Sequence, residues 1–367
     1  MTRSLSAMAS PHLKTLLPYS PGKPIEEVER EFGVAGAAKL ASNENPFGPS
    51  PLALKATQEA AATVHRYPDG AGTALKACLA ERLGVEPAQI ALGNGSNELL
   101  ELAARIFLQP GDEAVMASPA FIIYRMACQV LGAVAVEVPC RDFVHDLAGM
   151  AAAVSSRTKL LFVGNPNNPT GTAVPPATLE AFVRRLPPEP LLILDEAYWE
   201  FLPEGERPRS LDWVREGRRC FVLRTFSKAY GLAGLRVGYG VGPPELIGLL
   251  DRLRAPFNVN ALAQVAAAAA LEDCAHVTRT IAGTAEGRAA LAAGLTALGF
   301  RPVPSVTNFL LVDVRRDGAA VAEALLHQGV IVRPMGGYGL PTHLRITVGT
   351  AAENARALEA LRAVLAA

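Results

Sequence analysis

The residue with the clearest chemical potential is Lys228, in the segment Leu223–Arg236, which reads LRTFSKAYGLAGLR. Lys228 follows a predicted β-strand and Ser227 directly precedes it, while Arg236 lies eight residues further on, beyond a turn of small residues. A lysine that forms an imine must be held rigidly and have its pKa lowered by burial or by neighbouring cations. Lys228 is therefore a candidate imine-forming lysine, and the alternative is an ordinary solvent-exposed lysine at the end of a strand.

A second candidate group lies at the end of LLILDEAY, residues 191–198. The apolar run predicts a buried parallel strand, and Asp195 and Tyr198 lie at its carboxyl end, where ligand sites form in α/β proteins. A carboxylate there could keep a pyridine nitrogen protonated, which makes the ring an electron sink. The competing interpretation is that Asp195 caps the next helix.

Two loops could contribute polar groups to the same site. The loop 165–171, NPNNPTG, contains Asn168 and follows the predicted strand KLLFV; Asn-Pro steps make a rigid turn in any protein, but this one lies one βα unit before the predicted strand 191–195. The segment 93–98, GNGSNE, precedes the predicted helix LLELAARIF, and the free N–H groups of Ser96 and Asn97 could hold a phosphate. The segment does not fit GxGxxG, which counts against a dinucleotide site and a dehydrogenase.

Arginines flank a glycine-rich loop near the carboxyl terminus, in RPMGGYGLPTHLRITVG. Arg333 opens this segment and Arg345 begins a predicted strand. The planar guanidinium group suits bidentate binding of a carboxylate or a phosphate, so both arginines are candidate anion ligands. Surface salt bridges are the alternative interpretation.

The elements that must position these residues follow an α/β pattern. From about residue 90 to 245, short β-branched runs alternate with helical segments, which predicts a mostly parallel central sheet flanked by helices. The pattern after about residue 300 (strand, helix, strand, strand, helix) predicts a separate, smaller α+β domain. We expect residues 1–40 to form an amino-terminal arm and the start of the small domain, 41–250 the large domain, and 251–367 the small domain.

Composition narrows the classes of function. The 367 residues include 35 basic and 35 acidic side chains, and this neutral balance argues against nucleic acid or an acidic membrane as the partner. Five scattered cysteines favour reduced thiols over a disulfide framework, and six histidines without a ligand spacing make a metal site improbable. No apolar run reaches the roughly 18 residues that span a bilayer. We therefore predict a cytoplasmic protein that acts on small molecules.

Taken in this order, the segments resemble the fold-type-I pyridoxal-phosphate aminotransferases of class II over nearly the whole chain. The resemblance implies pyridoxal 5′-phosphate as cofactor, carried by the large domain. Lys228 matches the lysine that holds it as a Schiff base, and Asp195 matches the partner of the pyridine nitrogen. Tyr198 and Asn168 match the pair that hydrogen-bonds the phenolic oxygen. The residues that match the phosphate cradle are Ser96, Asn97, Ser227 and Arg236.

Two aromatic residues add to the resemblance. Phe121, in SPAFIIY, falls where the family places the aromatic ring that stacks on the pyridine, a position that is tyrosine in many relatives. Phenylalanine keeps the stacking and lacks the hydroxyl. Tyr67, in HRYPD, matches a tyrosine that reaches the phosphate bound by the neighbouring subunit. The resemblance therefore implies a homodimer with shared active sites.

The finer resemblance is to the histidinol-phosphate aminotransferases, carried by LPYSPGKPI at 17–25, by LASNENPFGP at 40–49 and by the carboxyl-terminal arginine segment. It implies that L-histidinol phosphate and 2-oxoglutarate become imidazole-acetol phosphate and L-glutamate, a step of histidine biosynthesis. Aromatic-amino-acid aminotransferases and phosphothreonine decarboxylases share this framework and remain alternatives; an aminotransferase-like transcription regulator would need an upstream DNA-binding module. The residues implied to meet the substrates are Tyr19, Asn45, Arg333 and Arg345.

Overall fold

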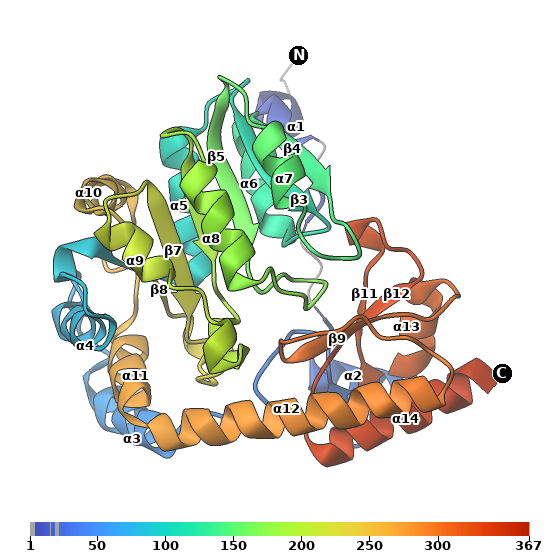
Figure 1. Cartoon of the computed structure of the whole chain (residues 1–367). Helices are drawn as coiled ribbons and strands as arrows, with labels where there is room; N and C mark the ends of the chain where they lie inside the picture. The colour runs from blue at the N-terminus through green and yellow to red at the C-terminus, as the bar shows by residue number, and fades with distance from the viewer. Residues whose placement is uncertain (1–3, 15, 19–21, 367) are drawn as a thin grey trace.

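The computed structural model describes residues 4–14, 16–18 and 22–366 (Figure 1). It has a large unit built on a seven-stranded sheet and a smaller unit at the carboxyl-terminal side. The long helix α12 (Cys274–Ala297) runs along the base of both units (Figure 1). The two units are therefore connected by this one continuous helix.

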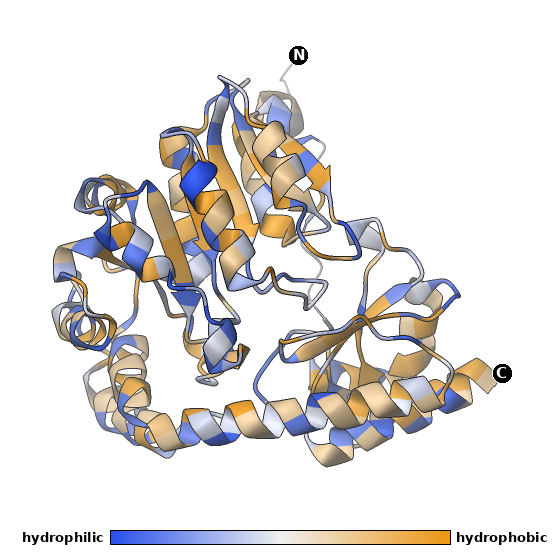
Figure 2. Cartoon of the chain, in the orientation of Figure 1, coloured by the Kyte–Doolittle hydropathy of each residue, from blue (hydrophilic) through white to orange (hydrophobic). Residues whose placement is uncertain are grey.

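The central sheet is mostly parallel, as predicted, because β8 alone among its strands runs antiparallel to its neighbours. Its inner strands are mostly apolar and buried, which is typical of parallel strands covered on both faces. Figure 2 shows these apolar strands enclosed by helices. The spatial order is β2 (Ile90–Gly93), β8 (Gly238–Val241), β7 (Cys220–Thr225), β6 (Leu191–Asp195), β5 (Thr158–Gly164), β3 (Glu113–Ser118) and β4 (Val134–Pro139).

Side chains alternate between the two faces of the sheet, so each strand feeds two cores. On β6, Ile193 packs into the core formed with α5 (Ser96–Phe107), α6 (Ile122–Leu131) and α10 (Pro244–Leu253). Leu192 and Leu194 pack into the opposite core. The helices of that second core are α3 (Pro51–Ala60), α4 (Thr73–Leu83), α7 (Leu147–Ala152), α8 (Pro176–Arg185), α9 (Ser210–Arg215) and α11 (Ala261–Glu272).

The smaller unit is the predicted α+β domain, built on the antiparallel strands β9 (Phe309–Asp313), β12 (His343–Thr347) and β11 (Arg333–Pro334). The run VIVRPM, predicted as one strand, is divided between two sheets, because β10 (Val330–Ile331) pairs with β1 (Ala38–Lys39). The helices of this region are α2 (Ile25–Phe32), α13 (Gly318–Leu326) and α14 (Ala351–Ala366), and α1 (Leu5–Met8) lies further upstream.

The packing bears on the predicted domain boundaries without fixing them. Strand β1 pairs with β10 and Val28 of α2 packs beside Ile331, which favours the expected start of the small domain within residues 1–40. Helix α11, however, packs on α3 in a core of the large sheet. A division later than residue 250, inside α12, is therefore favoured by the contacts, and the boundary stays a prediction.

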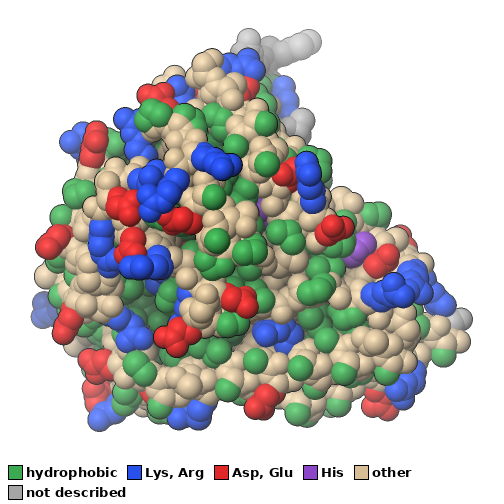
Figure 3. Space-filling view, viewed as in Figure 1, with side chains coloured by type: hydrophobic (Ala, Val, Ile, Leu, Met, Phe, Trp, Pro, Cys, Tyr) green, Lys and Arg blue, Asp and Glu red, His purple; other side chains and the backbone are tan. Residues whose placement is uncertain are grey.

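Surface charge and helix length bear on the classes of partner considered from the sequence. On the face in Figure 3, basic and acidic side chains are interspersed and do not separate into a continuous basic region. Among the described residues, no helix combines the length and the apolar character needed to cross a membrane. Within the same residues, no group of three or more His, Cys, Asp and Glu side chains could hold a metal ion.

Candidate active site

A cavity of about 450 Å³ opens at the carboxyl ends of the parallel strands, between the central sheet and the small unit. Strands β3, β5, β6 and β7 end there, as does the turn between β2 and α5, so side chains from distant parts of the sequence converge at one sheet edge. The predicted residues that line it are Ser96, Asn97, Phe121, Asn168, Asp195, Tyr198, Ser227, Lys228, Arg236 and Arg345.

Lys228 lies on the turn that follows β7, with its side chain in the cavity. Burial, assisted by the positive charges of Arg345 and Arg236, lowers the pKa of its amino group to about 8. The amine donates to the carbonyl oxygen of Ser42 at 3.3 Å. The lowered pKa raises the fraction of neutral amine near physiological pH, and the neutral amine is the nucleophilic and basic form.

Asp195 ends β6 and is 6% exposed. Its Oδ2 accepts a hydrogen bond from the hydroxyl of Tyr124 at 2.8 Å, and its Oδ1 accepts from the backbone N–H of Ala197 at 3.1 Å. Burial raises its pKa, while the Tyr124 hydrogen bond and the charge of Lys228 act in the opposite direction. The tyrosine is itself fixed, because its ring stacks on Phe162 with centroids 4.9 Å apart. Asp195 is therefore an oriented carboxylate able to share a proton.

Tyr198 faces the cavity from the first turn after β6 and is tied to the small unit. The amide of Asn43 donates to its phenolic oxygen at 2.8 Å, and the backbone N–H of Asn43 donates to Oγ1 of Thr347 on β12 at 2.9 Å. Burial raises the pKa of Tyr198, so its hydroxyl stays protonated and can donate a hydrogen bond. Its ring centroid lies 5.9 Å from Nζ of Lys228.

One end of the cavity can receive a phosphate. Helix α5 begins there with Ser96, and Nη1 of Arg236 donates to Oγ of Ser227 at 3.3 Å. Two glycines permit this close approach: Gly95 has a φ of +74°, and a Cβ on Gly238 would lie 2.6 Å from the backbone nitrogen of Ser96. A helix amino terminus, a hydroxyl and a guanidinium group together form an anion cradle.

The small unit brings an arginine to the other end. Arg345, on β12, is 4% exposed; its Nη1 donates to Oδ1 of Asn168 at 2.5 Å and its Nη2 donates to the carbonyl of Ala41 at 2.8 Å. Arg333 on β11 is its direct partner in the antiparallel register, so the two guanidinium groups start from the same face of the sheet. Arg333 lines a separate cavity of about 610 Å³.

Two further predicted residues, Asn45 and Tyr67, lie outside the cavity wall. The Asn45 amide donates to the carbonyl of Ala229, the residue that follows Lys228, at 3.1 Å. Tyr67 is 83% exposed and stacks on Phe257, with ring centroids 4.7 Å apart. Tyr19 lies outside the described residues. The roles predicted for these residues stay predictions.

Two residues of the site, Tyr124 and Asn43, were not predicted from the sequence. Tyr124 belongs to an apolar helix and cannot be told from a core tyrosine by its spacing; the signal available was its position three residues after Phe121, nearly one helical turn. Asn43 adopts a φ of +55°, a conformation that asparagine tolerates better than most residues, and it lies in the polar run SNEN. That run could have pointed to a constrained, functional turn.

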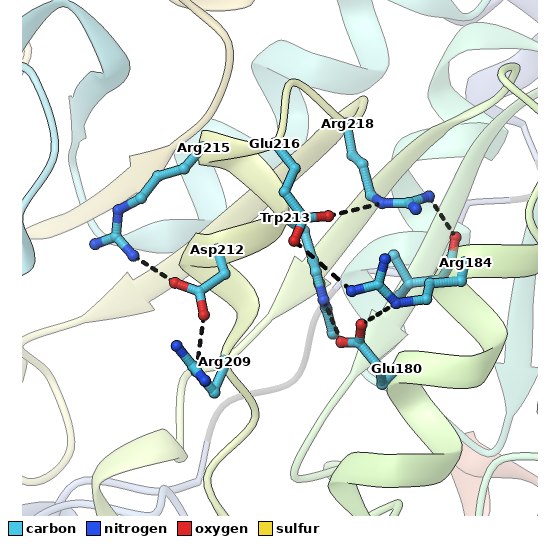
Figure 4. Close-up of polar contacts among 9 residues, drawn as sticks. Glu180, Arg184, Arg209, Asp212, Trp213, Arg215, Glu216 and Arg218 are labelled. Carbon is cyan, nitrogen blue, oxygen red and sulfur yellow. Dashed lines mark hydrogen bonds and ion pairs between the residues drawn. The ribbon is translucent and has the colours of Figure 1, made fainter.

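A second cavity, of about 710 Å³, lies between α8 and α9 and is larger than the first. Its wall consists mainly of ion pairs, such as Arg209–Asp212 and Arg215–Asp212 at 2.7 and 2.6 Å (Figure 4). Because these arginines are already paired, and the carboxyl ends of the strands lie elsewhere, volume alone does not identify the reactive site. The arrangement of groups favours the smaller cavity.

The residues in the smaller cavity fit a planar pyridine cofactor that carries an aldehyde and a phosphate. Lys228 supplies the amine, Asp195 a partner for a ring nitrogen, and Tyr198 a donor for a ring hydroxyl. Phe121 supplies an aromatic wall, and the cradle at Ser96 receives the phosphate. The donor set, the aromatic wall and the glycine clearances thus agree with the cofactor predicted from the sequence.

Comparisons with known proteins give the same assignment. The model of the family "Aminotransferase class I and II" matches residues 36–361. Histidinol-phosphate aminotransferase 1 of Nitrosococcus oceani is 51% identical over 98% of this chain and 97% of its own length, and that of Thiobacillus denitrificans is 52% identical over 99% and 94%.

Solved structures agree in fold. Histidinol-phosphate aminotransferase of Sinorhizobium meliloti, in complex with pyridoxal-5′-phosphate, superposes with a TM-score of 0.90 at 33% identity, covering 98% of this chain and 97% of that chain. Aspartate aminotransferase of Thermus thermophilus with maleate gives a TM-score of 0.83 at 28% identity, covering 99% and 100%. The predicted fold class is therefore confirmed. The chain belongs to the class I and II aminotransferases and, among them, to the histidinol-phosphate aminotransferases.

Proposed function

We propose that this chain transfers the amino group of L-histidinol phosphate to 2-oxoglutarate, with pyridoxal 5′-phosphate held at Lys228. The observation that carries the proposal is the joint geometry of one cavity: an amine with a pKa of about 8, a buried carboxylate, a phosphate cradle, and an arginine at the opposite end. The names of relatives about 50% identical over nearly the whole chain support the choice of substrate.

The chain supplies binding and proton transfer. When bound, the cofactor provides an electron sink for the electron pair left by removal of the substrate's α-proton. Asp195, held by Tyr124 and by the Ala197 N–H, keeps a proton on the ring nitrogen. Neutral Lys228 would take the substrate's α-proton as a general base and hold that proton for its return. Tyr198, protonated and fixed by Asn43, donates a hydrogen bond beside the reacting amine.

Two substrates of different charge must use one site. Histidinol phosphate presents a phosphate monoester, whereas 2-oxoglutarate and glutamate present carboxylates. Arg345 lines the cavity that holds Lys228, and Arg333 is its register partner on the neighbouring strand. The planar guanidinium group of Arg345 can bind a phosphate or a carboxylate there, so it suits either anion.

An absorbance titration tests the proposal. The purified protein with pyridoxal 5′-phosphate should show an imine band that L-histidinol phosphate bleaches and 2-oxoglutarate restores. Lys228→Ala should abolish the band. A band that responds to phenylalanine and not to histidinol phosphate would instead support an aromatic-amino-acid aminotransferase. Release of carbon dioxide from a phospho-amino acid, without a keto acid, would support a decarboxylase.

We also propose that the chain forms a homodimer in which Tyr67 reaches the partner's phosphate site. Tyr67 and Phe257 form an exposed aromatic stack, an apolar feature of the surface suited to a partner. Sedimentation should give a dimer. Mixed dimers of Lys228→Ala and Tyr67→Ala chains should recover activity, because one of their two sites then has both residues; no recovery would contradict the shared site.

A cytoplasmic location is proposed from thiol chemistry. All five cysteines are free, and Cys128 and Cys220 are buried. Burial raises the pKa of the Cys128 thiol to about 12, so it stays protonated and unreactive. A reducing compartment suits such a set of thiols, and fractionation of cells that express a tagged chain checks this.

A further inference from the structure

A buried ion pair lies behind the cavity, on the opposite face of the central sheet. Because side chains alternate along a strand, Asp195 points to the face of Tyr124 and Phe162, and Glu196 points to the other face. Arg224 on β7 points to that second face as well. Glu196 is fully buried and Arg224 is 4% exposed, and neither residue lines the cavity.

The two side chains form a tight contact. Nε and Nη2 of Arg224 lie 2.9 and 2.8 Å from Oε2 of Glu196. The guanidinium carbon of Arg224 lies 3.8 Å from the ring centroid of Trp199, and that of Arg207 lies 4.6 Å from the same ring. Arg207 also donates to the carbonyls of Glu200 and Leu202, at 3.0 and 3.1 Å. Trp199 is thus contacted by both guanidinium groups, and both hold the same turn.

The contacts join the two segments that carry the reacting groups. Asp195 and Tyr198 line the cavity, and each is followed directly in sequence by a residue that contacts Arg224. These residues are Glu196 and Trp199. One short segment therefore places its reactive side chains in the cavity and its contacts with Arg224 on the other side. Arg224 lies four residues before Lys228, directly ahead of the turn that holds it. A backbone hydrogen bond from Glu196 N–H to the Leu223 carbonyl, at 2.8 Å, reinforces the same junction.

We propose that Arg224, Glu196 and Trp199 form a brace that sets the position of Asp195 and Tyr198 relative to Lys228, and that Arg224 is a positioning residue for the transamination reaction. The inference deepens the proposed function and rests on it. A buried ion pair is weak evidence for stability, since apolar residues of similar size often replace such pairs without loss of stability. The ion pair connects the segment that carries Asp195 with the strand that leads to Lys228, so it can fix the relative positions of these two side chains.

The test compares three forms of the full-length protein. The first is the apolar pair Glu196→Leu with Arg224→Met, the second is Arg224→Lys, and the third is the wild type. A matched control is Glu113→Leu with Arg157→Met, which removes an ion pair with a buried carboxylate at the amino end of β3, remote from the cavity. Each form is assayed for kcat and KM, cofactor dissociation constant, thermal unfolding, and hydrogen exchange of the amides of residues 196–202.

We expect the apolar pair to unfold near the wild-type temperature, to lose about 10- to 100-fold in kcat with KM changed less than about threefold, and to bind the cofactor more weakly. Exchange in residues 196–202 should accelerate in the apo and cofactor-bound forms. Arg224→Lys, which keeps the charge and loses the planar double contact, should lie between the apolar pair and the wild type. The control pair should match the wild type in kcat, cofactor binding and local exchange.

Wild-type kcat, cofactor affinity and exchange in a folded apolar pair would overturn the proposal. If the apolar pair does not fold, the Arg224→Lys variant provides the test. Wild-type kcat, cofactor affinity and exchange in that variant would also contradict the proposal. Failure of the proposed function is distinguishable: a wild type that ignores histidinol phosphate refutes the substrate, while cofactor affinity, local exchange and the glutamate half-reaction still report on the brace.

Discussion

Replacing Tyr124 by phenylalanine should reduce catalysis without disturbing substrate binding. The Tyr124 hydroxyl lies 2.8 Å from Oδ2 of Asp195, and both residues are buried, at 1% and 6% exposure. Phenylalanine keeps the ring that stacks on Phe162 and removes that donor alone. Asp195 then keeps the single N–H donor of Ala197, and its pKa rises further above the ordinary carboxyl value.

The size of the effect follows from the hydrogen bond lost. A hydrogen bond to a charged group contributes about 1.5–3 kcal/mol. If the whole of this stabilises the Asp195 carboxylate while the ring nitrogen stays protonated, losing it lowers kcat by roughly 10- to 150-fold. Both KM values should stay close to wild type, because Tyr124 holds the partner of the cofactor and makes its polar contact with Asp195.

Steady-state kinetics in both half-reactions, with an absorbance pH titration of the cofactor-bound protein, check this reasoning. The imine and pyridinium bands should titrate at a different pH in Tyr124→Phe. Tyr230→Phe is the matched control, since Tyr230 is a buried tyrosine outside the cavity wall. A Tyr124→Phe protein with wild-type kcat and titration would refute the claim that this hydroxyl controls Asp195.

Three further perturbations have expected outcomes. Lys228→Met should stabilise the apo protein below pH 8, because lowering the lysine pKa from 10.5 to about 8 costs the folded state up to roughly 3 kcal/mol. The cost is smaller where solvent in the open cavity screens the charge. The gain in stability should fade between pH 8 and 10.5, and urea unfolding at several pH values measures it. Burial raises the pKa of Glu200 from 4.5 to about 7, so wild-type stability should fall as pH rises from about 4.5 to 7, and Glu200→Gln should flatten that part of the profile. Arg345→Lys should raise the KM for 2-oxoglutarate about tenfold or more, with a smaller change in kcat, because lysine loses the bidentate geometry; an unchanged KM would remove Arg345 from the carboxylate site.

The central sheet and its reactive edge could be predicted because the evidence is local. The run LLILD ends in a carboxylate, and LRTFSK ends in a lysine, so an apolar strand and its chemical residue are adjacent in sequence. Parallel strands deliver such ends to one edge. That rule is enough to place Asp195 near Lys228, and the structure puts both in the wall of one cavity.

Contacts between the two units could not be predicted in the same way. The Asn43–Tyr198 hydrogen bond joins residues 155 positions apart, and it exists because β12 of the small unit fixes the backbone of Asn43. The run VIVRPM likewise divides between two sheets according to which strands lie beside it. Periodicity gives the state of a segment and leaves its tertiary partner undetermined.

The alternation along β6 and the turn after it explains why chemistry and support are interleaved in DEAYWE. A shift of one residue in the pairing of β6 would turn Asp195 toward Arg224 and Glu196 toward the cavity, because every side chain would change face. Glu196 is one methylene longer and would meet Tyr124, not the guanidinium group that now lies 2.8 Å away. Arg224 would then face the shorter Asp195 carboxylate in place of Glu196, so its close contact with Glu196 belongs to the observed register. The pair that we propose positions Asp195 and Tyr198 therefore also favours the register in which Asp195 faces the cavity.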